Sequence, residues 1–280
     1  MHTPVLLKTV VEGLQVAPGK RYIDATFGEG GHTKAIIASG GRVLALDRDA
    51  TQISNFNALT ESKALAANLT LREGNFSDIE EIAKKENFAP VDGILFDLGL
   101  SYEQISKEGL GLSFKSTHEV LDMRLDESAK QSASTILHTY TQDELTSLFM
   151  RNAEEIHAAD IAKEIVIKRV GMHTFTVGWL VTLIKEAVRN QANSAVTRVF
   201  QALRIEVNNE FENLILGLTG ASHILAPGGR IAVISFHSLE DRMVKMFIKK
   251  HGFTQIGKKA LFGDQNLRFE RSAVLRIFYL

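Results

Sequence analysis

The chain has 280 residues with 32 Lys and Arg against 33 Asp and Glu, so its net charge is −1. Hydrophobic residues form 45% of the chain and there are only 4 Pro, which excludes a disordered or collagen-like polypeptide. The absence of cysteine excludes disulfides, cysteine-ligated zinc, iron–sulfur clusters and a thiolate nucleophile. The apolar runs are too short to span a membrane and the N-terminus lacks a signal-peptide pattern, so we expect a cytoplasmic protein.

The first hundred residues alternate between strand and helix signals. Short apolar strands are predicted at 21–26, 42–47, 68–73 and 91–98, and the first is followed by glycines and a helix from about Thr33. Strands separated by helices build βαβ units. This region therefore predicts a doubly wound, mostly parallel sheet.

The pattern changes after about Ser101. Residues 105–118 are rich in Gly, Ser and Lys and are predicted to form a loop, and no strand is expected from there to about residue 225. Asp143 and Asp160 stand where helix N-caps would be useful. Apolar residues with helical spacing follow in three segments, 161–168, 177–188 and 196–218.

The strand signal returns near the C-terminus. Residues 227–229 predict a turn, 230–236 a strand and 272–280 a final strand. The economical fold is α/β, with a mostly parallel sheet that is interrupted by an all-helical insertion and completed by the C-terminal segment. The expected domains are a core of residues 1–104 and 205–280 and an insertion of residues 105–204.

A glycine-rich loop follows the first strand, in the sequence Asp-Ala-Thr-Phe-Gly-Glu-Gly-Gly-His-Thr at 24–33. Asp47 ends the next strand, where a carboxylate can accept hydrogen bonds from both hydroxyls of a ribose. Thr33 occupies the third glycine position of a dinucleotide loop, and Asp24 places a carboxylate where pyrophosphate would lie. S-adenosylmethionine carries an ammonium, a sulfonium and no phosphate, so the loop favours it over NAD. Glycines that serve only a tight turn are the structural alternative.

Two further strand ends carry candidate ligand contacts. Phe76 follows the third strand, where an aromatic ring offers adenine a flat apolar face, although taken alone it is better explained by ordinary core packing. Asp97 ends the fourth strand and can accept a hydrogen bond from a substrate amine or from the methionine part of the cofactor. Its alternative role is an N-cap for the following turn. Residues 97–101 lack the Pro-Pro-aromatic signature that often follows this position in amino-methyltransferases acting on bases.

The C-terminal segment is locally basic. Residues 228–280 contain 10 Lys and Arg and 4 Asp and Glu, which gives this segment a charge of +6. A concentrated basic region can follow a phosphate backbone. A solvated surface that happens to be basic is the alternative.

Six motifs spread along almost the whole chain are similar to those of one known family. They lie at residues 24–32, 47–49, 92–99, 121–124, 197–205 and 234–242. The last two are long and hard to match by accident. Together the motifs resemble the RsmH (MraW) family, bacterial ribosomal-RNA methyltransferases that modify N4 of a cytidine in the decoding centre of the small subunit.

This resemblance implies a Rossmann-like methyltransferase core with a helical insertion that recognises RNA. It implies S-adenosylmethionine as the cofactor and 16S ribosomal RNA, within the small subunit, as the partner. The oligomeric state stays open, with a dimer as one option. The implied cofactor contacts are Gly30, Gly31, His32, Asp47, Phe76, Asp97 and Gln104.

The chain departs from the family pattern in four places. Where the family usually has Ser-Ser-Pro-Gln-Leu this chain has Ser-Tyr-Glu-Gln-Ile at 101–105, and it also differs at 110–114, 194–196 and 266–268. These departures cluster on the expected substrate side. They leave a non-catalytic ribosome-assembly factor that retains cofactor binding as the alternative function. An NAD-type oxidoreductase is a weaker alternative, because no acid or base for hydride transfer is recognisable.

Methyl transfer to an amine needs positioning and nearby acceptors rather than a covalent intermediate. We expect Asp97 to be the main catalytic residue, helped by the hydroxyl of Ser101. The expected substrate contacts are Arg124, Arg198, Arg204 and His237.

Several of these residues have structural alternatives. Arg198 and Arg204 can instead form ion pairs between the insertion and the core. His237 can instead cap the following helix through Glu240 and Asp241. No spacing of His, Asp and Glu makes a convincing metal site, since His237 with Asp241 would hold an ion only weakly.

Overall fold

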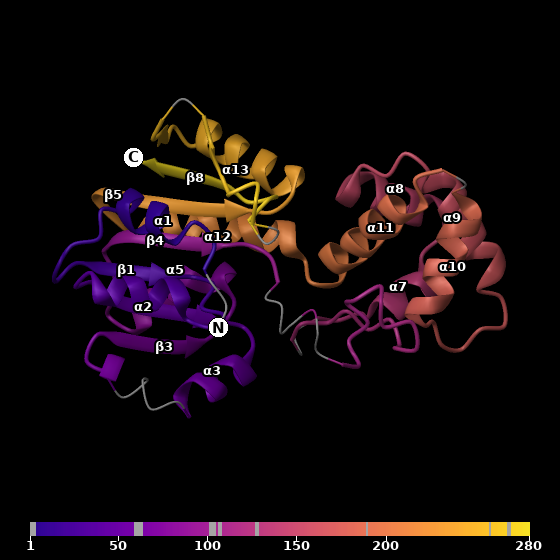
Figure 1. Cartoon of the computed structure of the whole chain (residues 1–280), viewed down its shortest axis with the longest axis horizontal. Coiled ribbons are helices and arrows are strands. Elements are labelled where there is room, and N and C mark those ends of the chain that lie inside the picture. The colour runs from indigo at the N-terminus through magenta and orange to yellow at the C-terminus, as the bar shows by residue number, and fades with distance from the viewer. Residues whose placement is uncertain are drawn as a thin grey trace. The chain divides into compact units, whose positions relative to one another are not determined.

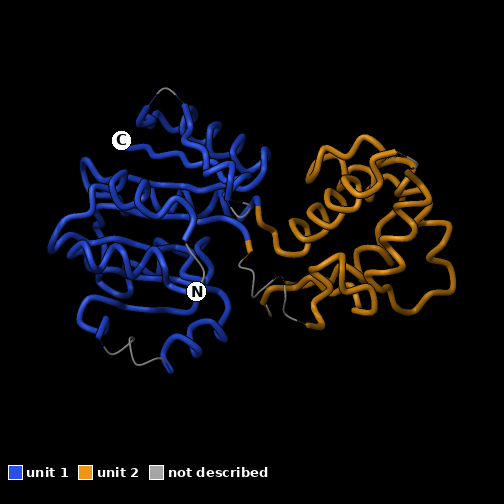
Figure 2. Tube along the Cα trace, in the orientation of Figure 1, with its two compact units in different colours: residues 1–99, 211–280 blue, residues 100–210 orange. Residues whose placement is uncertain are grey.

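The computed structural model describes residues 4–58, 64–100, 105, 108–126, 129–188, 190–257, 259–267 and 270–280. The chain divides into two compact units (Figure 2). The core unit comprises residues 1–99 and 211–280, and the helical unit comprises residues 100–210. The insertion expected at 105–204 lies entirely within the helical unit.

The core unit is built on one twisted sheet (Figure 1). Its order is β3-β2-β1-β4-β5-β8-β6, with β7 also paired to β8. The first five strands of this order run parallel and β8 runs antiparallel to β5, so the predicted mostly parallel sheet is confirmed. The strands are β1 Arg21–Asp24, β2 Arg42–Asp47, β3 Leu69–Glu73, β4 Val91–Asp97, β5 Leu225–Ser235, β6 Thr254–Gln255, β7 Leu261–Phe262 and β8 Val274–Tyr279.

Helices cover both faces of this sheet, because successive strand residues point to opposite sides. Ile23, Leu44 and Ile94 face one apolar layer, while their neighbours Tyr22 and Val43 face the other. The first layer is covered by η1 Phe76–Asp78, α5 Ile79–Lys85, α12 Glu210–Ile224 and α13 Ser238–Lys250, and the second by α1 Leu7–Gly13, α2 Gly31–Ala38 and α3 Ala50–Asn57.

The helical unit has its own apolar core, which includes Leu145, Phe149, Ile161, Leu180 and Val199. Outside its helices, the described residues of this unit contain one isolated β-bridge, between Val120 and Thr176. Its helices are α7 Ala133–Thr139, α8 Gln142–Ala153, α9 Ala158–Lys168, α10 Val177–Ala187 and α11 Ala192–Val207.

Three local predictions were wrong. The apolar run 196–218 is not one helix, because α11 ends at Val207 and α12 begins at Glu210, with Asn209 in the left-handed region at φ 49°. The side chain of Thr141 caps α8, so Asp143 lies in the first helical turn instead of at the cap.

Asp160 likewise lies in the first turn of α9. The fifth strand starts at Leu225, so the predicted turn at 227–229 falls inside β5, where Gly228 has φ 74° and the register with β4 shifts.

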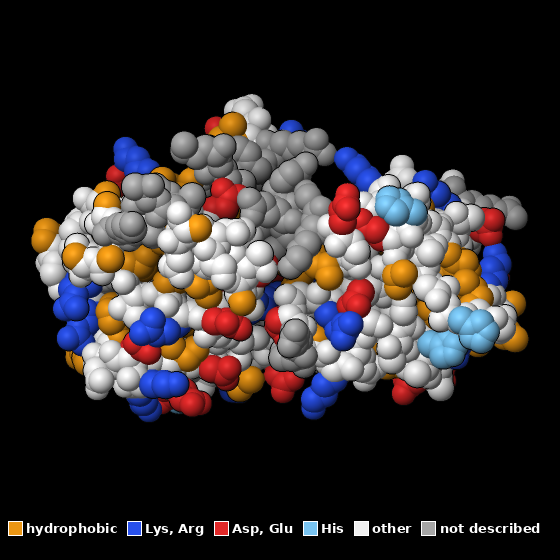
Figure 3. Space-filling model, turned by 90° about the horizontal axis from the view of Figure 1, so that it is seen from below, with side chains coloured by type: hydrophobic (Ala, Val, Ile, Leu, Met, Phe, Trp, Pro, Cys, Tyr) orange, Lys and Arg blue, Asp and Glu red, His pale blue; other side chains and the backbone are white. Residues whose placement is uncertain are grey.

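Charged side chains are dispersed over the surface. On the face shown in Figure 3, basic and acidic side chains lie interspersed, in keeping with the near-zero net charge. Within the described residues, none of the helices combines the length and hydrophobicity needed to cross a membrane.

Candidate cofactor and substrate site

The parallel strands of the core unit bring their carboxyl ends to one edge of the sheet. Asp24, Asp47 and Asp97 are the last residues of β1, β2 and β4, and His237 lies two residues beyond β5. Ligands of open α/β sheets bind at this edge. The three predicted acidic residues and His237 are thus brought to the edge where a ligand would bind.

The glycine loop between β1 and α2 is shaped by close packing. Gly30 has φ 75°, and a Cβ there would lie 2.7 Å from the ring of Phe27. A Cβ on Gly31 would lie 2.2 Å from Pro4. Glycine is therefore required at both positions, because a larger side chain would meet Phe27 or Pro4.

Asp24 is buried beneath this loop, with 1% of its surface exposed. Its carboxylate accepts hydrogen bonds from the Thr33 hydroxyl at 2.7 Å and from the Thr26 N–H at 3.3 Å. Burial raises the pKa of Asp24 to about 7, opposed by these hydrogen bonds and assisted by the negative charge of Asp47. A buried acid that is reluctant to ionise favours a neighbouring cation.

Asp47 is held in place by two backbone donors. Its Oδ2 accepts from Gly28 N–H at 2.8 Å and its Oδ1 from Asp49 N–H at 2.9 Å. Burial raises the pKa of Asp47, against the effect of these hydrogen bonds. Each carboxylate oxygen retains a lone pair, so the group can also accept hydrogen bonds from a diol.

Asp97 lies between β1 and β5 at the same edge. Its backbone N–H donates to Thr26 Oγ1 at 2.7 Å, and its buried Oδ1 has no hydrogen-bond partner among the residues that the structure describes. Its Oδ2 lies 3.6 Å from His32 Nδ1. Burial raises the pKa of Asp97 to about 8, with further contributions from the negative charges of Asp24 and Glu240. Among the described residues no backbone N–H donates to this carboxylate, so the alternative role as an N-cap has no support.

His32 and Phe76 have structural contacts that their sequence positions did not reveal. His32 is buried, and its Nε2 lies 2.9 Å from the carbonyl oxygen of Val5, which links α2 to the N-terminal segment. Phe76 packs edge-on against Phe96 with 5.7 Å between ring centroids. A Cβ on Gly217 would lie 2.8 Å from the Phe76 ring. Phe76 therefore belongs partly to the core, as its alternative interpretation suggested.

His237 is the N-cap of α13. Its Nδ1 accepts a hydrogen bond from the backbone N–H of Glu240 at 3.3 Å. In return, Glu240 Oε2 accepts from the N–H groups of Phe236, at 2.8 Å, and His237, at 3.3 Å. His237 therefore caps α13 with Glu240 as its partner, which is the structural alternative expected for it. Asp241 instead forms an ion pair with Arg276 at 2.6 Å.

Arg198 and Arg204 form ion pairs inside the helical unit. Arg198 Nε lies 2.7 Å from Glu155, whose side chain is 0% exposed. Arg204 makes two contacts with Glu210, at 2.8 and 3.0 Å. Arg198 therefore pairs within the expected insertion and not with the core. Arg204 pairs with Glu210, which lies beyond the expected insertion boundary at 204 but within the helical unit.

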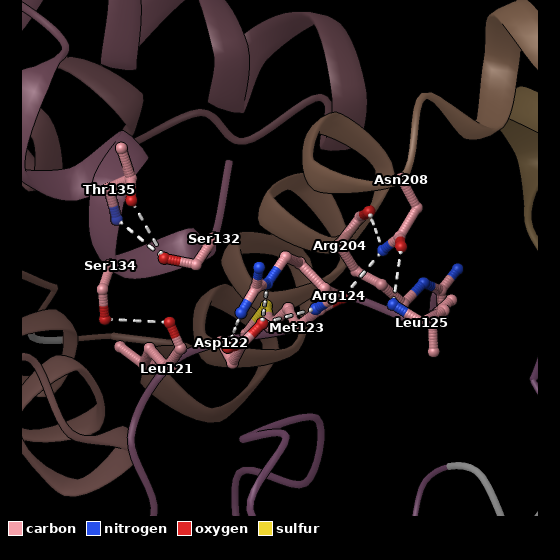
Figure 4. A network of polar contacts seen from close by, with 10 residues as sticks. All are labelled: Leu121, Asp122, Met123, Arg124, Leu125, Ser132, Ser134, Thr135, Arg204 and Asn208. Carbon is pink, nitrogen blue, oxygen red and sulfur yellow. Dashed lines mark hydrogen bonds and ion pairs between the residues drawn. The ribbon is translucent and has the colours of Figure 1, made fainter. Parts of the chain in front are cut away.

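Arg124, one of the expected substrate contacts, is hydrogen-bonded within the motif at residues 121–124 (Figure 4). Its guanidinium makes two hydrogen bonds with Asp122, at 2.7 and 2.8 Å, and 46% of the Arg124 side chain is exposed. Asn208 donates to the carbonyl oxygens of Met123 and Arg204 and accepts from Leu125 N–H. The motif at 121–124 and the end of α11 are therefore fixed to each other.

Two predicted residues, Ser101 and Gln104, lie outside the described residues. The described part of the chain holds no cluster of three or more His, Asp or Glu that could bind a metal ion. Sequence reasoning missed Thr26, whose hydroxyl accepts from the backbone N–H of Asp97 and so positions that residue. No local pattern points to this partner, because the two residues are 71 positions apart.

Comparisons with known proteins place the chain in one family. The model of the MraW methylase family matches residues 1–268. The chain is 44% identical to Ribosomal RNA small subunit methyltransferase H of Thermomicrobium roseum, over 89% of this chain and 77% of the relative. It is 37% identical to the protein of the same name from Dictyoglomus thermophilum, over 99% and 96%. A solved rRNA methylase from Streptococcus thermophilus is similar over 99% of this chain and 97% of its own, with a TM-score of 0.46 and 11% identity.

Proposed function

Because the chain belongs to the MraW methylase family, we propose that it transfers a methyl group from S-adenosylmethionine to N4 of a cytidine in 16S rRNA of the small ribosomal subunit. One observation carries the cofactor part of this proposal. Two acids with raised pKa values, Asp24 and Asp97, lie at the ligand edge of the sheet without a Lys or Arg partner among the described residues. This arrangement suits a cationic ligand that lacks phosphate.

The residues at the edge fit S-adenosylmethionine, whose contribution when bound is a methyl group on a cationic sulfur. Asp47 accepts hydrogen bonds from the ribose hydroxyls, in addition to those from Gly28 and Asp49. The backbone of the loop at 28–31 contacts the ligand closely, because its glycines have no side chains to intervene. Asp24 and Asp97 stabilise the positive charge, and the exposed edge of Phe76 packs against adenine.

Asp97 also orients the substrate. The lone pair of the cytosine amine is delocalised into the ring, so the amine is a poor nucleophile and gains positive charge during attack. The unpartnered Oδ1 of Asp97 accepts a hydrogen bond from the amine, which orients it and stabilises the developing charge. Holding the two reactants in line lowers the activation barrier by several kcal/mol, since ideal orientation can contribute about 7–11 kcal/mol.

The helical unit holds the RNA around the target base. A base within folded RNA must be splayed out before an enzyme can reach its amine. Arg124 is the most exposed of the predicted arginines and binds phosphate, with Asp122 fixing its direction. Arg198 and Arg204 are held by acids, so they contribute mainly to the shape of this unit.

The test uses purified protein, unmethylated small subunits and methyl-deuterated S-adenosylmethionine, followed by mass spectrometry of the nucleosides. Labelled N4-methylcytidine is expected. Calorimetric binding of S-adenosylmethionine without transfer of label would contradict the proposal and favour a ribosome-assembly factor. Asp92→Asn, at the other end of β4 from Asp97, is the matched control variant and should transfer label like the wild type.

A further inference from the structure

Two buried polar atoms lie beyond the ends of neighbouring strands without a hydrogen-bond partner among the described residues. Within the described residues, Asp97 Oδ1 and His237 Nε2 are the buried side-chain atoms without a hydrogen-bond partner. Asp97 pairs in register with Ile234, three residues before His237. A buried polar atom without a partner costs about 1–3 kcal/mol, so two at one sheet edge indicate a ligand that pairs with both.

The helix cap determines which of these atoms is a donor. His237 Nδ1 accepts the backbone N–H of Glu240, so a neutral imidazole carries its proton on Nε2. Glu240 Oε1 lies 3.1 Å from Nε2 but outside hydrogen-bond alignment, so it does not take up this donor. His237 therefore presents a donor. Asp97 presents an acceptor in its ionised form, which the positive charge of the bound cofactor favours.

The imidazole is held rigidly. Glu240 is 5% exposed, and its Oε2 accepts from the N–H groups of both Phe236 and His237. The Phe211 ring lies 6.0 Å from the imidazole, tilted by 54°. A fixed donor beside a fixed acceptor can discriminate between ligands that present different hydrogen-bond patterns.

We propose that these two atoms read the Watson–Crick edge of the target cytosine: Asp97 Oδ1 accepts from the N4 amine, and His237 Nε2 donates to ring N3. The inference rests on the proposed function and adds a specificity residue to it. Uracil presents an acceptor at O4 and a donor at N3, which is the opposite pattern, so it is rejected. Contacts in the plane of the base leave its face open to the methyl donor.

The test combines one change in the protein with one in the substrate. His237→Asn keeps an N-cap side chain for α13 but removes the Nε2 donor. Small subunits are reconstituted with 16S rRNA that carries cytidine or 3-deazacytidine at the target position, since the analogue keeps the amine and lacks N3. Each single change is expected to lower kcat/KM by about 10- to 100-fold, and the second change should then have no further effect.

Two controls separate recognition from folding. His237→Asn should bind S-adenosylmethionine and unfold thermally like the wild type, whereas His237→Ala should lose the cap and unfold at a lower temperature. His223→Asn, at a half-exposed histidine paired with Glu80 on α5, should leave kcat/KM unchanged for both substrates.

The outcomes distinguish this inference from the function on which it rests. If wild-type protein methylates cytidine and 3-deazacytidine equally well, or if the two losses multiply, the inference is overturned and the proposed function stands. If wild-type protein methylates neither, the proposed function fails and the inference fails with it. The comparison of the two substrates by the wild type is decisive even if His237→Asn does not fold.

Discussion

The core unit and the helical unit both bury acidic side chains, but they treat them differently. In the helical unit, Glu155 has no exposed surface and lies 2.7 Å from Arg198. In the core unit, Asp24 and Asp97 form no ion pair with a Lys or Arg among the described residues, and their pKa values are raised to about 7 and 8. A buried charge that is paired within the fold needs no ligand, whereas one without a counter-ion depends on a ligand.

The contrast separates two roles of buried acidic side chains. The Glu155–Arg198 pair needs nothing from outside the chain, so its removal should affect stability first. Asp24 and Asp97 make the cofactor-free fold less stable than neutral side chains would, so their replacement should affect ligand binding and turnover first. Four experiments test this division.

The largest effect is expected at Asp97. Replacing it with Asn keeps the shape but removes the negative charge, and should lower the rate of methyl transfer about 100- to 1000-fold. The thermal unfolding temperature should stay the same or rise, because a buried carboxylate is lost whose Oδ1 has no hydrogen-bond partner among the described residues. Single-turnover methylation of small subunits measures the rate, and an unchanged rate would remove Asp97 from the chemistry.

The second effect concerns stability in the helical unit. Arg198→Met leaves the charge of Glu155 buried and unpaired, which should lower the free energy of unfolding by about 3 kcal/mol. Urea denaturation measures this change. The double variant with Glu155→Met should recover most of the loss. A loss below about 1 kcal/mol in the single variant would show that the pair behaves like an exposed one.

The third effect is a dependence of stability on pH. An aspartate in the unfolded chain loses its proton near 3.8, whereas Asp24 and Asp97 keep theirs to about pH 7 and 8. Between these values the folded chain binds more protons than the unfolded one. The free energy of unfolding therefore falls as pH rises from about 4 to 8 and levels off above.

Thermal unfolding of the cofactor-free protein between pH 5 and 9 measures this slope. The Asp24→Asn, Asp97→Asn double variant should show a shallower slope than the wild type, and equal slopes would contradict the raised pKa values. Binding of S-adenosylmethionine should tighten over the same range, because a cation prefers the ionised acids, and calorimetry at each pH checks this.

The smallest effect is expected at Arg124. Its pair with Asp122 is partly exposed, so Arg124→Ala should change the free energy of unfolding by less than about 1 kcal/mol. Binding to small subunits should weaken several-fold, with a salt dependence reduced by about one phosphate contact. Filter binding at several salt concentrations measures both. Asp122→Ala is the matched control, and should not reduce the salt dependence because it keeps the cation.

Local sequence patterns were sufficient for the framework of the core. The strands ending in Asp24, Asp47 and Asp97 were predictable because an apolar run followed by a polar residue marks a strand and its end. The break between α11 and α12 was not, because the apolar spacing of Val207 and Phe211 continues through Asn208 and Asn209 without Gly or Pro.

Contacts between distant residues limited prediction of the site. Thr26 supports Asp97 across 71 residues, and Glu155 pairs with Arg198 across 43. No local pattern identifies such partners, because they meet only when the fold is complete. For the same reason the sequence could not decide whether Arg198 contacts RNA or forms an ion pair. It also placed the partner of Arg198 in the core, whereas the partner, Glu155, lies in the helical unit.

The insertion between β4 and β5 also sets an order of events during synthesis. β4 is the central strand of the sheet, yet its partner β5 is made about 130 residues later. At about 5–20 residues per second, the apolar edge of β4 waits on the order of ten seconds for β5 to leave the ribosome. A helical unit that folds during this interval brings the two ends of the long loop together and reduces the entropy lost when β5 pairs. The pairing of Glu155 with Arg198, without which that unit would carry a buried unpaired charge, would then also shorten the time for which the incomplete sheet is open to aggregation.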